Sequence, residues 1–188
     1  MAGAATSAAP GAAAGQVSVQ SSKVGGKISR KEVLNRAQYW WDRTYGKHGK
    51  KKDGNMHYGG PARPDPDGKH KYRQDCSGLV DMALHLKGGP NTVLLGKRNS
   101  KGKFVNSAYG YVISPKNMKP GDYTGFLGAG SDGSNGHVRL FIKWVNKQKG
   151  TYKAYDYGRT KIRIDTFNIH TDNKNGHKFG AYRYKKIS

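Results

Sequence analysis

The chain has 188 residues, of which 34 are Lys or Arg and 12 are Asp or Glu, so its formal net charge at pH 7 is +22. This length is enough for one domain with its own core, and the single cysteine excludes an internal disulfide. No apolar stretch approaches the roughly 20 residues of a membrane span. Glu32 is the only glutamate, so the chain cannot supply the pair of glutamates that many glycosidases use. The positive charge predicts attraction to polyanions.

Residues 1–27 are rich in Ala, Gly and Ser and lack hydrophobic periodicity. We therefore expect them to be disordered, and we expect residues 28–188 to form the folded domain. The segment lacks the basic start and leucine-rich centre of a standard signal peptide, although a processed secretory precursor can leave such a remnant.

The first helix is predicted directly after this segment. Ser29 and Glu32 have the spacing of a capping box, and the apolar residues that follow share one helical face. These residues are Val33, Leu34, Ala37, Trp40, Trp41 and Thr44. We expect both tryptophans to fill the core rather than to bind a ligand.

Residues 46–71 are predicted to form a long polar loop, because three prolines within residues 61–66 prevent regular structure. The loop leads directly to the only cysteine, so we expect it to form a wall of a substrate cleft. It contains His48, His57 and His70. No closely spaced ligand accompanies them, so we interpret them as surface residues and expect neither a metal nor another cofactor.

The only cysteine, Cys76, precedes an apolar run, Ser77 to Lys87, which predicts a buried helix. Asp75 is predicted to be its N-cap. In the first helical turn, free backbone N–H groups and the helix dipole favour the thiolate, the form that attacks acyl carbon. A lone cysteine can equally be an inert core residue, so a catalytic one needs a base from elsewhere in the chain.

Strands are predicted in the second half of the chain, after a tight turn at residues 119–122. They are Tyr123–Phe126, His137–Trp144, Tyr152–Tyr157, Ile162–Ile164 and Gly180–Tyr184. Because helices precede strands, the predicted fold class is α+β, with N-terminal helices packed on an antiparallel sheet. Such a fold can place a cysteine at a helix N-terminus opposite a histidine at the sheet edge.

His137 follows a glycine and begins a strand, so we predict that it is the base that takes the proton of Cys76. An orienting acceptor should lie near the end of the neighbouring strand, where Asp156 is the candidate and Tyr155 and Asp165 are weaker options. A shift of one residue in strand phase would turn Asp156 to the other face. The backbone N–H of Cys76 is the expected first oxyanion donor.

Three short motifs occur in one order: Asp75–Val80, Lys119–Asp122 and Gly136–Val138. This set resembles the NlpC/p60 family of papain-like cysteine peptidases, and the closing Tyr182–Tyr184 is similar to the end of secreted actinobacterial members. The resemblance covers about residues 28–187 and implies a papain-like α+β fold without circular permutation.

The resemblance implies that Cys76 is the nucleophile and His137 the base of an enzyme that cleaves peptidoglycan stem peptides without a metal, often beside a γ-linked D-glutamate. The family's third polar residue is commonly His, with Asn, Gln or an acid in some branches; here the matching strand carries Asp156. Tyr58 is the expected counterpart of an upstream tyrosine that helps to bind substrate. The other predicted substrate-binding residues are Asp75, Ser77 and Gly136.

The leading interpretation is a secreted or cell-wall monomer that hydrolyses peptidoglycan amide bonds through a thioester, concentrated on anionic wall polymer by its positive charge. A thiol acyltransferase or toxin acting on a protein is one alternative. Another is a non-catalytic cationic protein that binds polyanions, in which tyrosines among the lysines could stack on bases. We do not expect nucleic acid as a partner, because the basic residues are scattered and no compact nucleic-acid motif occurs.

Overall fold

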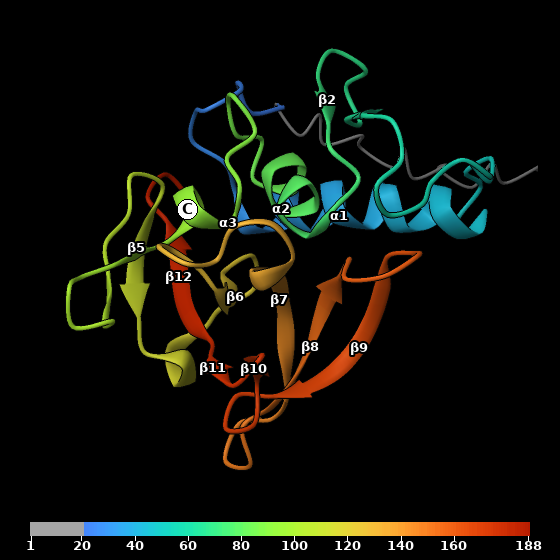
Figure 1. Ribbon diagram of the computed structural model, residues 1–188. Helices are drawn as coiled ribbons and strands as arrows, with labels where there is room; N and C mark the ends of the chain where they lie inside the picture. The colour runs from blue at the N-terminus through green and yellow to red at the C-terminus, as the bar shows by residue number, and fades with distance from the viewer. Residues whose placement is uncertain (1–20) are drawn as a thin grey trace, which may run out of the picture.

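A computed structural model describes residues 21–188 and has the α+β architecture predicted from the sequence. The helices gather on one side of a six-stranded antiparallel sheet with strand order β5-β12-β6-β7-β8-β9 (Figure 1). In that order the strands are Gly110–Ile113, Gly180–Tyr184, Tyr123–Phe126, His137–Asn146, Thr151–Asp156 and Arg163–Asn168.

The helices are α1 (Arg30–Tyr45), α2 (Cys76–Ala83) and α3 (Thr92–Leu95), with 3-10 turns at Pro115–Asn117 and Gly133–Asn135. Three small hairpins complete the elements: β1 (Arg63–Pro64) with β2 (Lys71–Tyr72), β3 (Lys97–Arg98) with β4 (Phe104–Val105), and β10 (Asn173–Lys174) with β11 (His177–Lys178). Within residues 21–188, no helix is both long and apolar enough to cross a membrane.

Helix α1 begins and ends where its sequence predicts. The Ser29 side chain accepts a hydrogen bond from the backbone N–H of Glu32 at 3.1 Å, and Gly46 ends the helix with a φ of 67°, a conformation that suits glycine. Trp40 is fully buried and donates its indole N–H to the Pro64 carbonyl at 2.9 Å, whereas Trp41 is only partly buried against the core. Trp40 therefore ties α1 to the loop that precedes α2.

Helix α2 is shorter than predicted: it ends at Ala83 and does not reach Lys87. All eight of its residues are buried, between α1 and the sheet. His85 has a φ of 53°, so the chain has already left the helix before it reaches Lys87. Each large apolar side chain buried in this way contributes about 2 kcal/mol to folding.

The sheet carries a core on each face, as alternating side chains require. Val138 and Leu140 of β7 belong to the larger core, which includes the buried side chains of α1 and α2. Phe141 and Tyr152 belong to a smaller core on β7 and β8. Strand β5, which the sequence analysis missed, pairs with β12 at one edge of the sheet.

The N-terminal segment expected to be disordered lies mostly outside the described residues. Its last part, residues 21–27, instead lies against the domain: the backbone N–H of Gly25 donates to the His85 carbonyl at 2.7 Å. The two ends of the domain also meet, since Ile28 forms a parallel bridge with Ile187.

Candidate active site

Cys76 is the first residue of α2, and its position is set by the cap that precedes it. The Asp75 carboxylate accepts a hydrogen bond from the Gly78 backbone N–H at 2.6 Å, so the helix starts where the sequence predicted. Helix α2 packs on β7, and Cys76 is 8% exposed. Val138, the residue that follows His137, belongs to the same buried core as Cys76.

The ionisation of Cys76 differs from the sequence-based expectation. Burial raises the pKa of the Cys76 thiol to about 11, the Asp75 and Asp156 carboxylates act in the same direction, and the backbone amides of Val138 and Ser77 oppose them. The helix N-terminus therefore does not produce a resting thiolate, since desolvation of the charged form outweighs it. The sulfur is a thiol at neutral pH and needs a base that removes its proton as it reacts.

His137 and Asp156 are brought together by the register of β7 and β8. Asp156 pairs with Arg139 across the two strands, so it shares a sheet face with Arg139 and with His137 two residues earlier. His137 Nε2 lies 2.6 Å from Asp156 Oδ1. This contact confirms the strand phase on which the choice of Asp156 depended.

The Asp156 carboxylate fixes the tautomer of His137. Burial alone would raise the pKa of Asp156, but the His137 hydrogen bond and the charges of Arg139 and Arg163 lower it to about 2. An ionised carboxylate can only accept, so Nε2 of His137 carries a hydrogen and donates it. The other ring nitrogen, Nδ1, is then left with a lone pair that can accept a thiol proton.

Tyr58 lies in the loop that precedes α2. Burial raises the pKa of the Tyr58 hydroxyl, and the charges of Cys76 and Asp75 raise it further. The ring is 43% exposed and packs edge-on against Tyr157, with the ring centroids 5.8 Å apart. A side chain that is half open to solvent and within electrostatic reach of the sulfur can contact a substrate.

The other predicted substrate-binding residues, Asp75, Ser77 and Gly136, make structural contacts within the site. Asp75 caps α2 and pairs with Arg73, its Oδ2 lying 3.0 Å from the guanidinium Nε. The buried Ser77 hydroxyl donates to Asp75 at 3.1 Å and accepts from Arg73 at 2.8 Å. A Cβ on Gly136 would lie 2.1 Å from the Ser131 carbonyl oxygen. Gly136 is thus required by close packing just before His137.

Sequence analysis missed four residues that position this site. Arg163 of β9 binds Oδ2 of Asp156. A Cβ on Gly158 would lie 2.8 Å from His137 Cε1, so only glycine leaves room for the imidazole there. The Tyr157 hydroxyl donates a hydrogen bond to Gln74 Oε1 at 3.2 Å, and the Tyr157 ring packs against the Tyr58 ring. Their roles depend on contacts between distant segments, so no local sequence signal indicates them.

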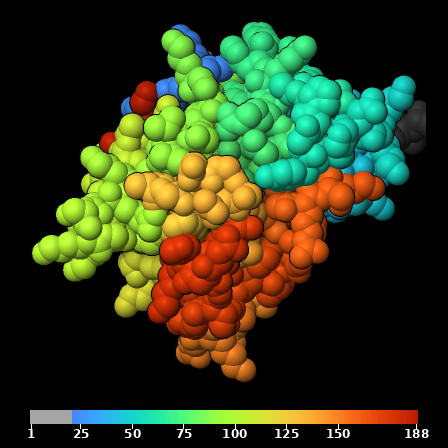
Figure 2. Space-filling model, viewed as in Figure 1, coloured from blue at the N-terminus to red at the C-terminus, as the bar shows by residue number. Residues whose placement is uncertain are grey.

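A basic cavity of about 200 Å³ adjoins the His137–Asp156 pair. Its lining includes the cationic side chains of Arg139, Arg159, Arg163 and Lys174. Figure 2 shows this side of the molecule, where the β10–β11 hairpin (red) lies next to the segment before β7 (light orange). Arg139 and Arg163 already pair with Asp172 and Asp156, so Arg159 and Lys174 are the cations of this lining that could bind a carboxylate of a ligand.

A further group with metal-ligand spacing lies away from this site. Among residues 21–188, Asp65, Asp67 and His85 place one ligand atom each within 4.8 Å of one another. The sequence analysis did not single out His85, which lies just after the end of α2 and outside the 46–71 loop.

The raised pKa of the Cys76 thiol makes its alkylation strongly pH-dependent. With a pKa of about 11, the thiolate fraction at pH 7 is on the order of 10⁻⁴, so the rate with iodoacetamide should rise about tenfold per pH unit until close to pH 11. Intact-mass spectrometry over a pH series measures this rate, with a small-molecule thiol of ordinary pKa as the control. A rate that levels off below pH 8 would contradict the neutral thiol and indicate a thiolate paired with an imidazolium.

Comparisons with family models, with curated proteins and with solved structures find no match to this chain.

Proposed function

We propose that this chain is a cysteine peptidase of the NlpC/p60 type, with a papain-like fold, that hydrolyses amide bonds in peptidoglycan stem peptides. The proposal is carried by one observation: the 2.6 Å contact of His137 with Asp156 at the start of β7, the strand against which the helix of Cys76 packs. Nucleophile, base and orienting carboxylate are the three parts that thiol catalysis of acyl transfer needs.

The chemistry follows from the protonation states. As the Cys76 sulfur attacks the amide carbon, its proton passes to Nδ1 of His137, while the backbone N–H of Cys76 stabilises the oxyanion. The C–N bond then breaks, the same proton goes to the leaving amine, and a thioester remains. Water attacks the thioester with His137 again as base, which releases a carboxylic acid and restores the thiol. Asp156 stabilises the imidazolium during both steps.

Charge supports an anionic substrate. The chain has a formal charge of +22, and the cavity beside His137 is lined by four cationic side chains. Peptidoglycan stem peptides carry free carboxylates, and anionic wall polymers would raise the local enzyme concentration at low salt. We therefore propose action at the cell wall by a secreted monomer, with no cofactor.

The test is incubation of the full chain with defined stem peptides, followed by mass spectrometry of the fragments. We expect one peptide bond to be cut, with one ¹⁸O atom from labelled water in the new carboxylate. The Cys76→Ala protein is the matched control for adventitious peptidase. An added amine that replaces water in the product would instead indicate an acyltransferase, and intact peptides across all stem sequences would reject the proposed substrate class.

A further inference from the structure

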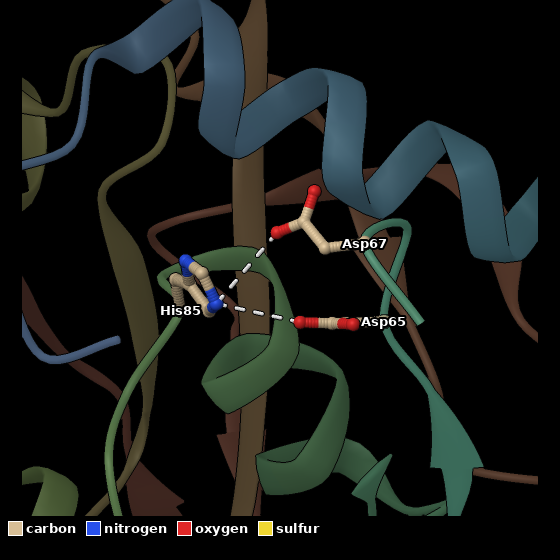
Figure 3. Close-up of side chains that lie close together, drawn as sticks. All are labelled: Asp65, Asp67 and His85. Carbon is tan, nitrogen blue, oxygen red and sulfur yellow. Dashed lines mark ion pairs between the residues drawn. The ribbon is translucent and has the colours of Figure 1, made fainter. Parts of the chain in front are cut away.

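Asp65, Asp67 and His85 converge at the side of the domain formed by α1 and the end of α2 (Figure 3). His85 Nε2 lies 3.3 Å from Asp65 Oδ2 and 3.9 Å from Asp67 Oδ2. Asp65 and His85 are almost fully buried, at 1% and 3% exposed. His85 Nε2, Asp65 Oδ2 and Asp67 Oδ2 therefore lie close together, and each can offer a lone pair to a bound ion.

Hydrogen bonds on the other side of the ring decide which nitrogen of His85 holds a proton. The Ser22 hydroxyl donates its one proton to Glu32 Oε1 at 2.7 Å. Ser22 Oγ also lies 2.9 Å from His85 Nδ1, so it must accept there, and Nδ1 carries the hydrogen. Nε2 of the neutral ring then has a bare lone pair, and within residues 21–188 it has no hydrogen-bond partner.

Arg36 is the cation that contacts the carboxylates of this cluster. Arg36 donates to Oδ2 of Asp65 and to Oδ2 of Asp67, both at 3.0 Å, and the Ser21 hydroxyl donates to the same Asp67 oxygen at 3.0 Å. Glu32 is a third carboxylate, 3.9 Å from Arg36. Three carboxylates thus surround one guanidinium, and the nearby lysines, Lys23 and Lys69, line the adjoining cavity.

A divalent cation matches both the carboxylates and the bare nitrogen of this cluster.

We propose that Asp65, Asp67 and His85 bind one divalent transition-metal ion of the zinc class, at a site separate from Cys76. One imidazole nitrogen and two carboxylate oxygens form a ligand set that zinc accepts, with water in the open position, whereas Mg²⁺ and Ca²⁺ prefer oxygen ligands alone. The Ser22 hydroxyl orients the imidazole from behind, and Arg36 orients both carboxylates. A cavity of about 550 Å³, lined in part by Asp67 and His85, gives the ion a path from solvent.

Such an ion would link the loop that carries Asp65 and Asp67 to the end of α2. Ser22, which contacts both His85 and Glu32 of α1, would connect this link to α1. Because binding to the folded state alone stabilises it, the expected consequence is a higher melting temperature. This inference does not depend on the proposed peptidase activity.

The test is calorimetric titration of ZnCl₂ into metal-stripped full-length protein that carries Cys76→Ala, which removes the only thiol as a competing ligand. We expect one equivalent to bind and the melting temperature to rise. Asp65→Asn and His85→Asn in the same background should each abolish the one-equivalent heat and the thermal shift. Asparagine is chosen at position 85 because it tolerates the positive φ of 53° there.

Two controls keep the result interpretable. His57→Ala removes an exposed histidine elsewhere and should leave the titration unchanged. Asp67→Asn alters a ligand that is 27% exposed on its side chain, so it should fold even if the buried variants do not, and it should lose the thermal shift. Co²⁺ should give a d–d absorption band that His85→Asn removes. No binding, binding unaffected by all three ligand variants, or equal affinity for Mg²⁺ would overturn the proposal.

Discussion

Replacing Cys76 with alanine should abolish stem-peptide hydrolysis while the domain still folds. Removal of the nucleophile leaves no atom in the site that can form the acyl-enzyme, so the expected loss in kcat is on the order of 10⁵-fold or more. The stability cost should be about 1 kcal/mol, because only one buried sulfur is removed. Fragment release measured by mass spectrometry and thermal unfolding followed by circular dichroism test the two parts.

His137→Ala should cause a comparable loss, and the chain offers a matched control for it. His177 is an exposed histidine that stacks on Phe126, the strand partner of His137, with ring centroids 4.3 Å apart. His177→Ala should therefore keep turnover within a few fold. Substantial hydrolysis by the folded Cys76→Ala protein, or equal losses in both histidine variants, would contradict the assigned catalytic pair.

Asp156→Asn should reduce kcat by about 10³- to 10⁴-fold, even though papain-like proteases use an asparagine as the residue that orients the catalytic histidine. Arg163 and His137 compete for the new amide: the guanidinium on Oδ2 can only donate, so it selects the amide oxygen. The amide NH₂ group then faces His137 Nε2. This forces the ring hydrogen onto Nδ1, the nitrogen that must accept the thiol proton.

The double variant Asp156→Asn with Arg163→Ala separates this tautomer effect from simple loss of charge. Without Arg163 the amide is free to rotate its oxygen toward Nε2, so activity should recover by at least tenfold over the single variant. Arg163→Ala alone, which leaves the carboxylate on His137, should retain most of its turnover. If the double variant is no better than the single one, the negative charge of Asp156 matters more than the tautomer it selects.

Much of the fold follows from local sequence. The cap at Ser29, the cap at Asp75 and the strand that starts at His137 all appear where they were predicted, because each depends on residues only a few positions apart. The end of α2 and strand β5 were not predicted correctly. Helix α2 ends at Ala83 because the chain turns at His85 toward the carboxylates of the 65–67 loop, a tertiary contact.

The site shows the same division between local and distant information. Cys76 and His137 were found from short motifs, and Asp156 from its place on the next strand. Arg163 could not be found, because its contact with Asp156 depends on the register of β8 with β9. The group of Asp65 and His85 was missed for a similar reason: nothing in the sequence brings a loop and a helix end together.

The buried, protonated state of Cys76 bears on how long the protein stays active. Peroxide and other oxidants attack the thiolate and react slowly with the thiol. The chain has no second cysteine, so an oxidised sulfur could not be rescued by forming an internal disulfide. For an enzyme proposed to work outside the cell, where reducing systems are absent, a sulfur that becomes reactive only when a substrate carbonyl arrives would avoid irreversible oxidation between turnovers.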